Sequence, residues 1–335
     1  MSERDKDKRK GNRPSLRDVA AEADVSMMTV SRALSGNGKI SVDTRNRVLQ
    51  AAQKVGYRPN LTARALRTNE SKLVGVTSPN LMMPLHIEIT LGAKEAFSAE
   101  GYRILLTVDP IHEHDQSPFI TDGDLILGSP PHHHSMENYT DRTRTVSLMG
   151  NEDLEIDTCS SDLTQPAMFA TRHLLTAGYR NIGLLQLDRS PSVHGYTQAH
   201  EDFGVAVNPD HVQLVGNDEP SVSQAIDRLL ATPTAPDALF IAGVAATPLA
   251  LRALRRREFL VPRDFGFIGS ESRRSELGDL VYPGMTAIRI PGYEIGAAGA
   301  RRLIERLRGD TSPPHKMNFP SELVIRESTP GPGRS

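Results

Sequence analysis

The chain has 335 residues, more than one ordinary hydrophobic core holds, so two or three folded units are expected. Apolar residues make up 38% and charged residues 24%, an ordinary composition that excludes a disordered or collagen-like protein. The single cysteine, Cys159, excludes an internal disulfide and a four-cysteine zinc site. There is no run of about eighteen apolar residues and no signal-peptide pattern at the charged N-terminus, so a cytoplasmic protein is expected.

Charge is distributed unevenly along the chain. Residues 1–70 contain 15 Lys or Arg and 8 Asp or Glu, a net charge of +7. The other residues contain the remaining 24 basic and 33 acidic side chains, a net charge of −9. A basic part joined to an acidic remainder is typical of a polyanion-binding module on a body that does not bind polyanions, although a basic tail that only aids solubility has the same composition.

The N-terminal part predicts a small helical head over 14–58. Residues 1–13 alternate charges without apolar periodicity and are expected to form a mobile basic arm. Each predicted helix follows a serine that can cap its first turn: one after Ser15, one over 27–34 after Ser26, and one after Ser41 that ends at Val55. A further short helix and linker are expected over 59–70.

From Leu73 onward, short apolar runs alternate with amphipathic helical stretches. The runs predict strands over 73–76, 104–108, 125–127, 145–148, 182–187, 212–215, 238–242, 265–268 and 286–290. The stretches predict helices over 87–99, 164–177, 222–230, 248–257 and 295–307. This alternation implies parallel sheets wound by right-handed crossovers, so the fold class is α/β, with an all-α head and two doubly wound lobes over 71–330. Lobe 1 is expected over about 71–160 and 291–320, and lobe 2 over about 161–290 and 321–330.

The first two predicted helices have helix-turn-helix spacing. The outward positions of the second helix are occupied by Ser26, Met27, Met28, Thr29, Ser31 and Arg32. Hydroxyl groups suit phosphate oxygens, and an arginine can form a bidentate contact with guanine. Met27 and Met28 could instead pack in the core of the head, but Val30 and Leu34 already supply its inward face. The head is therefore expected to bind double-stranded DNA.

These residues closely resemble the head of LacI/GalR-type bacterial repressors. The similarity runs over 15–20, 25–36, 41–45 and 51–60, and ends in 63–68. Weaker similarity covers most of the remaining chain, for example at 171–182 and 261–264. The resemblance implies a two-lobed body, like that of the periplasmic binding proteins, that dimerises and takes a small molecule, often a sugar or a nucleobase, between its lobes.

The resemblance also implies roles for individual residues. Met27, Met28 and Arg32 are expected to face bases in the major groove. Residues 60–68 would form a hinge helix on operator DNA, where Ala63 and Leu66 contact the DNA and Leu66 wedges between base pairs from the minor groove. Phosphate contacts are expected from Ser15, Ser26, Thr29, Ser31, Ser41, Thr44 and Asn60. Asp24 replaces the family's usual glycine in the turn, and aspartate tolerates a left-handed backbone better than most residues.

The body departs from the family where a ligand usually binds. Ser192 stands in place of the family's arginine, and Gly243-Val244 in place of its Asn-Asp pair. Those groups supply the bidentate bonds that a sugar requires, so common sugars are not expected as effectors. Other polar residues are candidates by position: Asn80, His86, Asp188, Arg189, His194, Glu271 and Arg289. Three alternatives remain, namely a different small molecule, a protein corepressor at the surface, or the loss of ligand control.

The sequence predicts neither a metal site nor a cofactor. Histidines gather in two predicted loops, at 112–115 and 132–134, but consecutive histidines rarely point the same way, so solvated loops are favoured. The chain has no phosphate-binding glycine loop with lysine, no nucleophile elbow and no helical pair of metal-binding histidines. A sugar-active enzyme therefore has only fold-level analogy behind it.

These features favour a homodimeric transcription regulator, a repressor of a palindromic operator. Its recognition helices would lie in the major groove and its hinge helices in the minor groove, under the control of a small-molecule effector. The segment 330–335 cannot form a helix that pairs dimers, so a dimer rather than a tetramer is expected. A solute-binding receptor shares the two-lobed body, but the head and the missing signal peptide argue against it.

Overall fold

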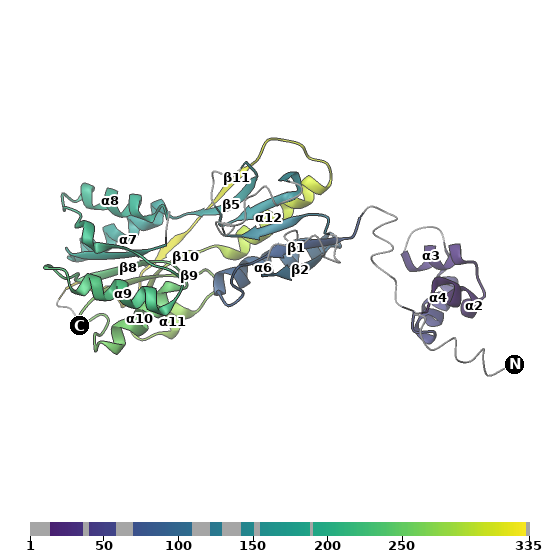
Figure 1. The fold of residues 1–335 in the computed structure, drawn as a ribbon, viewed down its shortest axis with the longest axis horizontal. Helices are drawn as coiled ribbons and strands as arrows, with labels where there is room; N and C mark the ends of the chain where they lie inside the picture. Colours follow the sequence, from purple (N-terminus) through teal and green to yellow (C-terminus); the bar gives the residue numbers. More distant parts are fainter. Residues whose placement is uncertain are drawn as a thin grey trace. The chain divides into compact units, whose positions relative to one another are not determined.

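A computed structural model describes residues 14–35, 40–57, 70–108, 121–128, 142–150, 155–187 and 190–332. The chain divides into two units, Met1–Ser71 and Lys72–Ser335. Their helices and strands are labelled in Figure 1.

Three helices occupy the described part of the first unit: α2 (Leu16–Ala23), α3 (Met27–Ser35) and α4 (Val42–Lys54). Small apolar side chains form their shared core: Val19, Ala20, Ala23, Val30, Ala33, Val48, Ala51 and Ala52. Helices this short are marginal alone, so this packing supplies most of their stability. At the surface, Lys54 Nζ lies 2.5 Å from Glu22 Oε1 and connects α4 to α2.

Two six-stranded sheets organise the second unit, one in each lobe. The sheet of lobe 1 has the order β11-β5-β4-β3-β1-β2, with β1 (Leu73–Thr77), β2 (Arg103–Thr107), β3 (Asp124–Leu127), β4 (Thr145–Leu148), β5 (Asp157–Asp162) and β11 (Lys316–Pro320). The sheet of lobe 2 has the order β12-β10-β9-β8-β6-β7, with β6 (Ile182–Gln186), β7 (Val212–Leu214), β8 (Ala238–Ala242), β9 (Gly266–Ser272), β10 (Thr286–Ile290) and β12 (Glu322–Val324). The pairings are parallel except for β10 with β12. The predicted α/β class is confirmed, whereas β5, β11 and β12 were not predicted.

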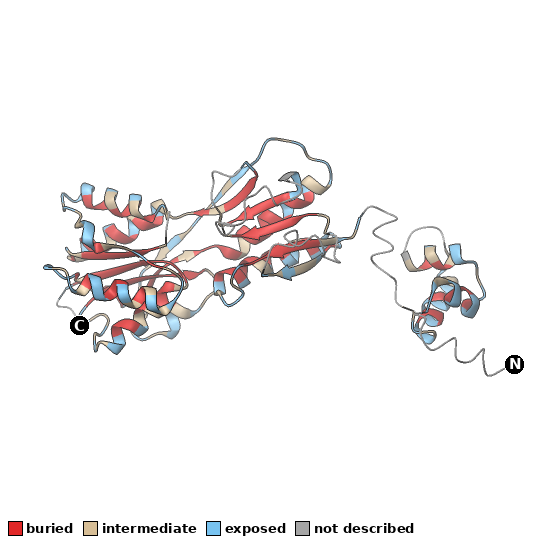
Figure 2. Cartoon of the chain, in the orientation of Figure 1, coloured by how far each residue is buried: buried red, intermediate tan, exposed pale blue. Residues whose placement is uncertain are grey.

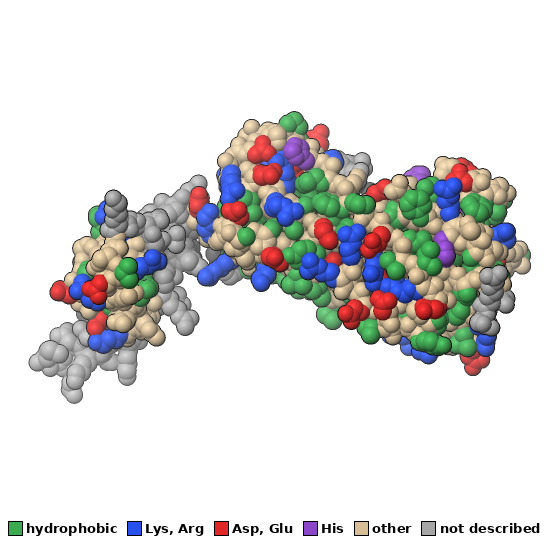
Figure 3. Space-filling model, turned by 180° about the vertical axis from the view of Figure 1, so that it is seen from behind, with side chains coloured by type: hydrophobic (Ala, Val, Ile, Leu, Met, Phe, Trp, Pro, Cys, Tyr) green, Lys and Arg blue, Asp and Glu red, His purple; other side chains and the backbone are tan. Residues whose placement is uncertain are grey.

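Helices cover the sheets of both lobes. In lobe 2, α7 (Thr164–Ala177) and α8 (Ser192–Asp202) lie on one face, and α9 (Glu219–Leu230) and α10 (Ala246–Arg256) lie on the other (Figure 1). Lobe 1 carries α6 (Pro84–Ala99) and α12 (Gly292–Leu307). Short helices α11 (Leu277–Leu280), Arg142–Arg144 and Pro209–His211 occupy connections. Figure 2 shows the central strands of the sheets and the inward helix faces as buried. Figure 3 shows acidic and basic side chains intermingled on one face of the body.

Two helix pairs pack closely enough to require glycine. A Cβ atom on Gly296 of α12 would overlap the carbonyl group of Ile89 in α6. A Cβ atom on Gly195 of α8 would overlap the carbonyl group of Thr164 in α7. Backbone therefore meets backbone at both crossings, and an added methyl group has no space there.

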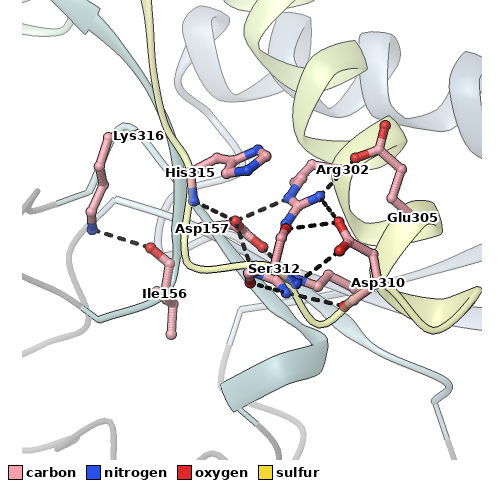
Figure 4. Close-up of polar contacts among 9 residues, drawn as sticks. Ile156, Asp157, Arg302, Glu305, Asp310, Ser312, His315 and Lys316 are labelled. Atoms are coloured by element: carbon pink, nitrogen blue, oxygen red, sulfur yellow. Dashed lines mark hydrogen bonds and ion pairs between the residues drawn. The ribbon is translucent and has the colours of Figure 1, made fainter.

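A buried ionic cluster connects α12 to the amino end of β5 (Figure 4). Asp157, 2% exposed, lies 3.0 Å from Arg302 Nε and 2.6 Å from Arg306 Nε, and it accepts a 2.7 Å hydrogen bond from the backbone N–H of His315. Burial of Asp157 opposes its ionisation, but the hydrogen bonds from Arg306, His315 and Arg302 outweigh that cost and lower the pKa of its carboxyl group. Arg302 also contacts Asp310, so the segment after α12 joins the same cluster.

Candidate nucleic-acid interface and effector site

The turn between α2 and α3 has helix-turn-helix geometry. Asp24 adopts the left-handed conformation, with φ 49° and ψ 54°, and the N–H of Val25 donates to the carbonyl group of Ala20 at 3.1 Å. The prediction that aspartate tolerates this conformation is confirmed. The turn ends at Ser26, and α3 begins at Met27.

Helix α3 turns large side chains away from the core of the head. Val30 is fully buried and Ala33 is 2% exposed, whereas Met27 is 52% exposed and Met28 64% exposed. Arg32 is exposed as well and lies four residues after Met28, so the two share one face of the helix. The two methionines therefore lie outside the core, and the alternative of core packing is excluded.

Hydroxyl side chains stabilise the first turns of the helices in the head. Ser26 Oγ accepts a hydrogen bond from the N–H of Thr29 at 3.1 Å, and Ser41 Oγ accepts one from the N–H of Thr44 at 3.2 Å. Asp18 accepts hydrogen bonds from the N–H and the hydroxyl group of Ser15, both at 2.8 Å. Such caps satisfy part of the first turn and leave further N–H groups for an anion such as phosphate.

Several predicted site residues lie outside the described residues: Asn60, Ala63, Leu66, Asp188 and Arg189. The histidine segments at 112–115 and 132–134 do so too. Within the described ranges, His, Cys, Asp and Glu side chains form no group of three that could hold a metal ion. The helices of the same ranges include none long and apolar enough to cross a membrane.

In lobe 1, candidate effector residues gather between β1 and α6. Ser78 and His86 are buried, and Ser78 Oγ lies 2.9 Å from His86 Nδ1. Asn80 uses its Oδ1 to accept a hydrogen bond from the N–H of Met82 at 2.9 Å. Burial lowers the pKa of His86, which favours the neutral imidazole, against a smaller opposing effect of a backbone hydrogen bond at Asn80. In parallel sheets the carboxyl ends of the strands are where ligands bind, and this cluster follows the carboxyl end of β1.

In lobe 2, Glu271 and Arg289 contact each other. Glu271 is fully buried, and its Oε1 lies 2.9 Å from Arg289 Nε and 3.4 Å from Arg326 Nη2. Its Oε2 accepts a 2.8 Å hydrogen bond from the N–H of Gly278, and Arg289 also pairs with Asp279 at 3.2 Å. Both oxygens of the Glu271 carboxylate thus have partners within the protein. The contact with Arg326 could not be predicted, because Arg326 lies 55 residues further along the chain.

Helix α8 carries a candidate effector residue, His194, and the serine that stands in place of the family's arginine, Ser192. His194 is exposed in the first turn of α8. Ser192, at the place of the family's arginine, is 2% exposed, and its Oγ accepts a 3.0 Å hydrogen bond from Ser190 Oγ. After β8, the carbonyl group of Gly243 accepts a hydrogen bond from Thr247 Oγ1 at 2.9 Å.

Comparison with known proteins gives matches over nearly the whole chain. A family model described as bacterial regulatory proteins, lacI family, matches residues 15–60, and one described as a periplasmic binding protein-like domain matches residues 171–329. The HTH-type transcriptional repressor CytR of Escherichia coli (strain K12) is 32% identical over 97% of this chain and 98% of its own length. The chain belongs to the LacI family.

Other LacI-family proteins match over similar lengths. Catabolite control protein A of Priestia megaterium is 27% identical over 93% of this chain and 98% of its own length. A solved lac repressor dimer bound to operator and the anti-inducer ONPF has a TM-score of 0.80 at 21% identity, covering 95% of this chain and 99% of that one. The transcriptional regulator CelR in its cellobiose complex has a TM-score of 0.67 at 26% identity, covering 94% and 100%. The chain is a DNA-binding transcription regulator and not an enzyme, as the sequence predicted.

The two lobes of this LacI-family body are joined by a buried carboxylate that the sequence did not single out. Glu88 of α6, 5% exposed, accepts hydrogen bonds from the N–H of Arg274, after β9 in lobe 2, and from the N–H of Tyr293 in α12, both at 3.2 Å. The guanidinium group of Arg274 stacks on the ring of Tyr293 at 3.4 Å, a favourable cation–π contact. Glu88 therefore connects α6 to the loop at the carboxyl end of a lobe 2 strand.

Sequence reasoning also missed Gln186, the last residue of β6. It is 6% exposed, and its Oε1 is buried without a hydrogen-bond partner among the described residues. A buried acceptor without a partner is costly, and a ligand can supply the missing donor. The signal in the sequence was a single polar residue at the end of the apolar run Ile182–Leu185.

Proposed function

We propose that this chain is a homodimeric repressor that binds a palindromic operator and responds to a small molecule. The arm is assigned to 1–13, the head to 14–58, the hinge helix and linker to 59–70 and the two-lobed body to 71–330. The head would read bases through Met27, Met28 and Arg32 in the major groove, while the hinge helix binds the minor groove through Ala63 and Leu66. Such a protein acts in the cytoplasm, where its DNA lies.

The surface of α3 is the observation that carries this proposal. Two large apolar side chains and an arginine are exposed on the second helix of a helix-turn-helix, next to the capped first turns of α3 and α4. Hydroxyls, helix N-termini and basic side chains position a protein on phosphates, and base-edge contacts then specify the sequence. The net charge of +7 over residues 1–70 supports the electrostatic part of binding.

Selection from a random duplex library with the full-length protein tests the proposal. We expect an enriched palindrome, bound with an affinity that falls steeply with salt, since several phosphates are neutralised. Random duplex of equal length is the control and should bind at least about 1000-fold more weakly at physiological salt. Failure to enrich any sequence would contradict the proposal.

A homodimer is supported by apolar side chains that the body leaves exposed. Ile87 and Leu91 lie one turn apart on α6, and Leu280 and Tyr282, in lobe 2, are 76% and 99% exposed. Exposed apolar side chains that recur on neighbouring positions are typical of interfaces. Light scattering of the full chain should give the mass of two chains, and a mass near four chains would contradict the expected dimer.

For the effector, the buried polar groups at the carboxyl ends of β1 and β6 support a polar, uncharged small molecule. Ser78, His86 and Gln186 offer hydrogen bonds without a net charge, and His194 is the exposed candidate nearby in sequence. Asp188 and Arg189 stay candidates by their position after β6. Glu271 and Arg289, which form an ion pair with each other, also stay candidates. A thermal-shift screen of nucleosides and nucleobases, with sugar phosphates as charged controls, tests this, since a ligand at 100 times its Kd stabilises by about 2.7 kcal/mol.

A further inference from the structure

The start of α3 combines two unusual features. Met27 and Met28 are adjacent, and each exposes more than half of its side chain, at 52% and 64%. The core-facing positions of α2 and α3 are buried, with Val19 and Val30 fully buried, whereas α4 exposes two further apolar side chains, Val42 at 77% and Leu49 at 47%. Two large apolar side chains beside each other on a small head are therefore explained by a partner rather than by the fold.

The chemistry of methionine restricts what that partner can offer. A thioether donates no hydrogen bond and accepts only weakly, so neither side chain can form the bidentate contacts that distinguish adenine or guanine. The C5-methyl group of thymine is the one apolar group that a standard base pair presents in the major groove. A flexible, polarisable methionine side chain can adapt its shape to such a methyl group.

The backbone of α3 holds both side chains at the end that approaches base edges. Ser26 caps the helix through the N–H of Thr29, so the first turn is fixed in place. In helix-turn-helix proteins the N-terminal residues of the second helix contact base edges. Met28 and Arg32 are four residues apart and lie on one face, so the base read by Met28 is expected within a base pair or two of the guanine read by Arg32.

We infer that Met27 and Met28 read thymine methyl groups, and that each operator half-site carries thymines at the two positions they face, one of them close to a guanine. This inference rests on the proposed operator binding and adds the identity of the bases. Loss of one contacted methyl group corresponds to about a fourfold loss of affinity, the equivalent of about 0.8 kcal/mol per buried carbon group.

Replacement of thymine by deoxyuridine tests the inference, because it removes only the methyl group and keeps the base pair. With the selected operator and the full-length protein, deoxyuridine at each of the two positions should weaken binding about fourfold, and thymines elsewhere in the duplex serve as controls. Met28→Ala should bind thymine and deoxyuridine operators equally at its position. Arg32→Ala, the matched control, should weaken binding but keep the preference for thymine over deoxyuridine.

The outcomes separate this inference from the proposed function. No enriched sequence would overturn both. An enriched palindrome that deoxyuridine never weakens, or that lacks thymine near the guanine assigned to Arg32, would overturn the inference and leave operator binding intact. Met28→Gln is a second variant at the same exposed position. If it still preferred thymine over deoxyuridine, readout of the methyl group by Met28 would be contradicted.

Discussion

The head and the body place their charged side chains in opposite ways. In the described part of the head, buried side chains are apolar, and the ion pair of Lys54 with Glu22 is exposed, at 73% and 34%. In the body, Asp157 and Glu271 are 2% and 0% exposed, and each contacts two arginines. The polar groups of the head are thus available to an external partner, whereas those of the body hold its own elements together.

This difference predicts that substitutions in the two regions have separate effects. Substitution of a buried polar residue in the body should change the free energy of unfolding and leave the operator affinity of the folded protein unchanged. A substitution on the outward face of α3 should do the reverse, because its side chains contribute little to the core of the head.

Asp157→Asn is expected to have the largest effect. Removing this charge leaves Arg302 and Arg306 buried beside a neutral side chain, and breaking such a buried pair costs about 3–5 kcal/mol. Urea unfolding of the two proteins measures the change. Asp264→Asn, which removes the charge paired with Arg263 at the surface and keeps an oxygen that can accept the N–H of Leu260, is the matched control and should cost much less. A loss of less than about 1 kcal/mol for Asp157→Asn would show that the buried charges of the body contribute no more to stability than exposed charges do.

The effect of Asp157→Asn should also depend on pH. The pKa of Asp157 is lowered in the folded protein, and that of an unfolded Asp is about 3.9. Its charge therefore stabilises the fold fully above that unfolded pKa, and this contribution is lost as pH falls through the folded pKa. The difference in unfolding free energy between wild type and Asp157→Asn should stay constant from pH 7 to about pH 5 and shrink below about pH 4. A difference that grows with acid would contradict the assigned charge state.

Glu88→Gln should have an intermediate effect. Both carboxylate oxygens of Glu88 accept backbone N–H groups. The side-chain amide of glutamine has only one oxygen, so its NH₂ group would face one of these backbone N–H groups. The expected cost is about 1–3 kcal/mol of unfolding free energy. Glu95→Gln, on the same helix, should change stability much less, because Glu95 is exposed and an amide oxygen in its place can still accept the hydroxyl group of Tyr293. If Glu88→Gln lost operator affinity without losing stability, the claim that buried polar residues of the body affect stability alone would be contradicted.

The smallest expected effect is that of common monosaccharides on the operator complex. Each sugar hydroxyl that is buried without a partner costs about 1–3 kcal/mol, and Ser192 and Gly243-Val244 lack the groups that would pair with it. Unphosphorylated hexoses and pentoses at millimolar levels should leave the complex intact. Release with a sub-millimolar midpoint would show that other residues rebuild a sugar site.

Capped, periodic segments of the fold could be predicted from the sequence. Helix α7 was predicted at its observed bounds, 164–177, because its apolar stripe ends at Gly178, whose left-handed φ of 106° stops the helix. Helix α8 was missed, since it has few apolar side chains and contains Gly195 near its start. The outward position of Met27 and Met28 was predicted correctly from the inward pattern of Val30.

Elements that depend on distant partners could not be predicted. Strand β5 reads Asp-Thr-Cys-Ser-Ser-Asp, which has no strand pattern. It is a strand because its backbone pairs in parallel with β4 and β11, and its first residue, Asp157, contacts the arginines of α12. In the same way, the ion pair of Glu271 with Arg326 could not be predicted, because the two residues are 55 positions apart in the sequence.

Operator binding by Arg32→Ala tests the central claim most directly. We predict that this variant unfolds at the same urea concentration as wild type and binds the selected operator about 1–3 kcal/mol more weakly, with little change on random duplex. That result would show that α3 reads the sequence of the DNA while the body carries the stability. Equal losses on operator and random DNA would contradict the account, because Arg32 would then contact only phosphate.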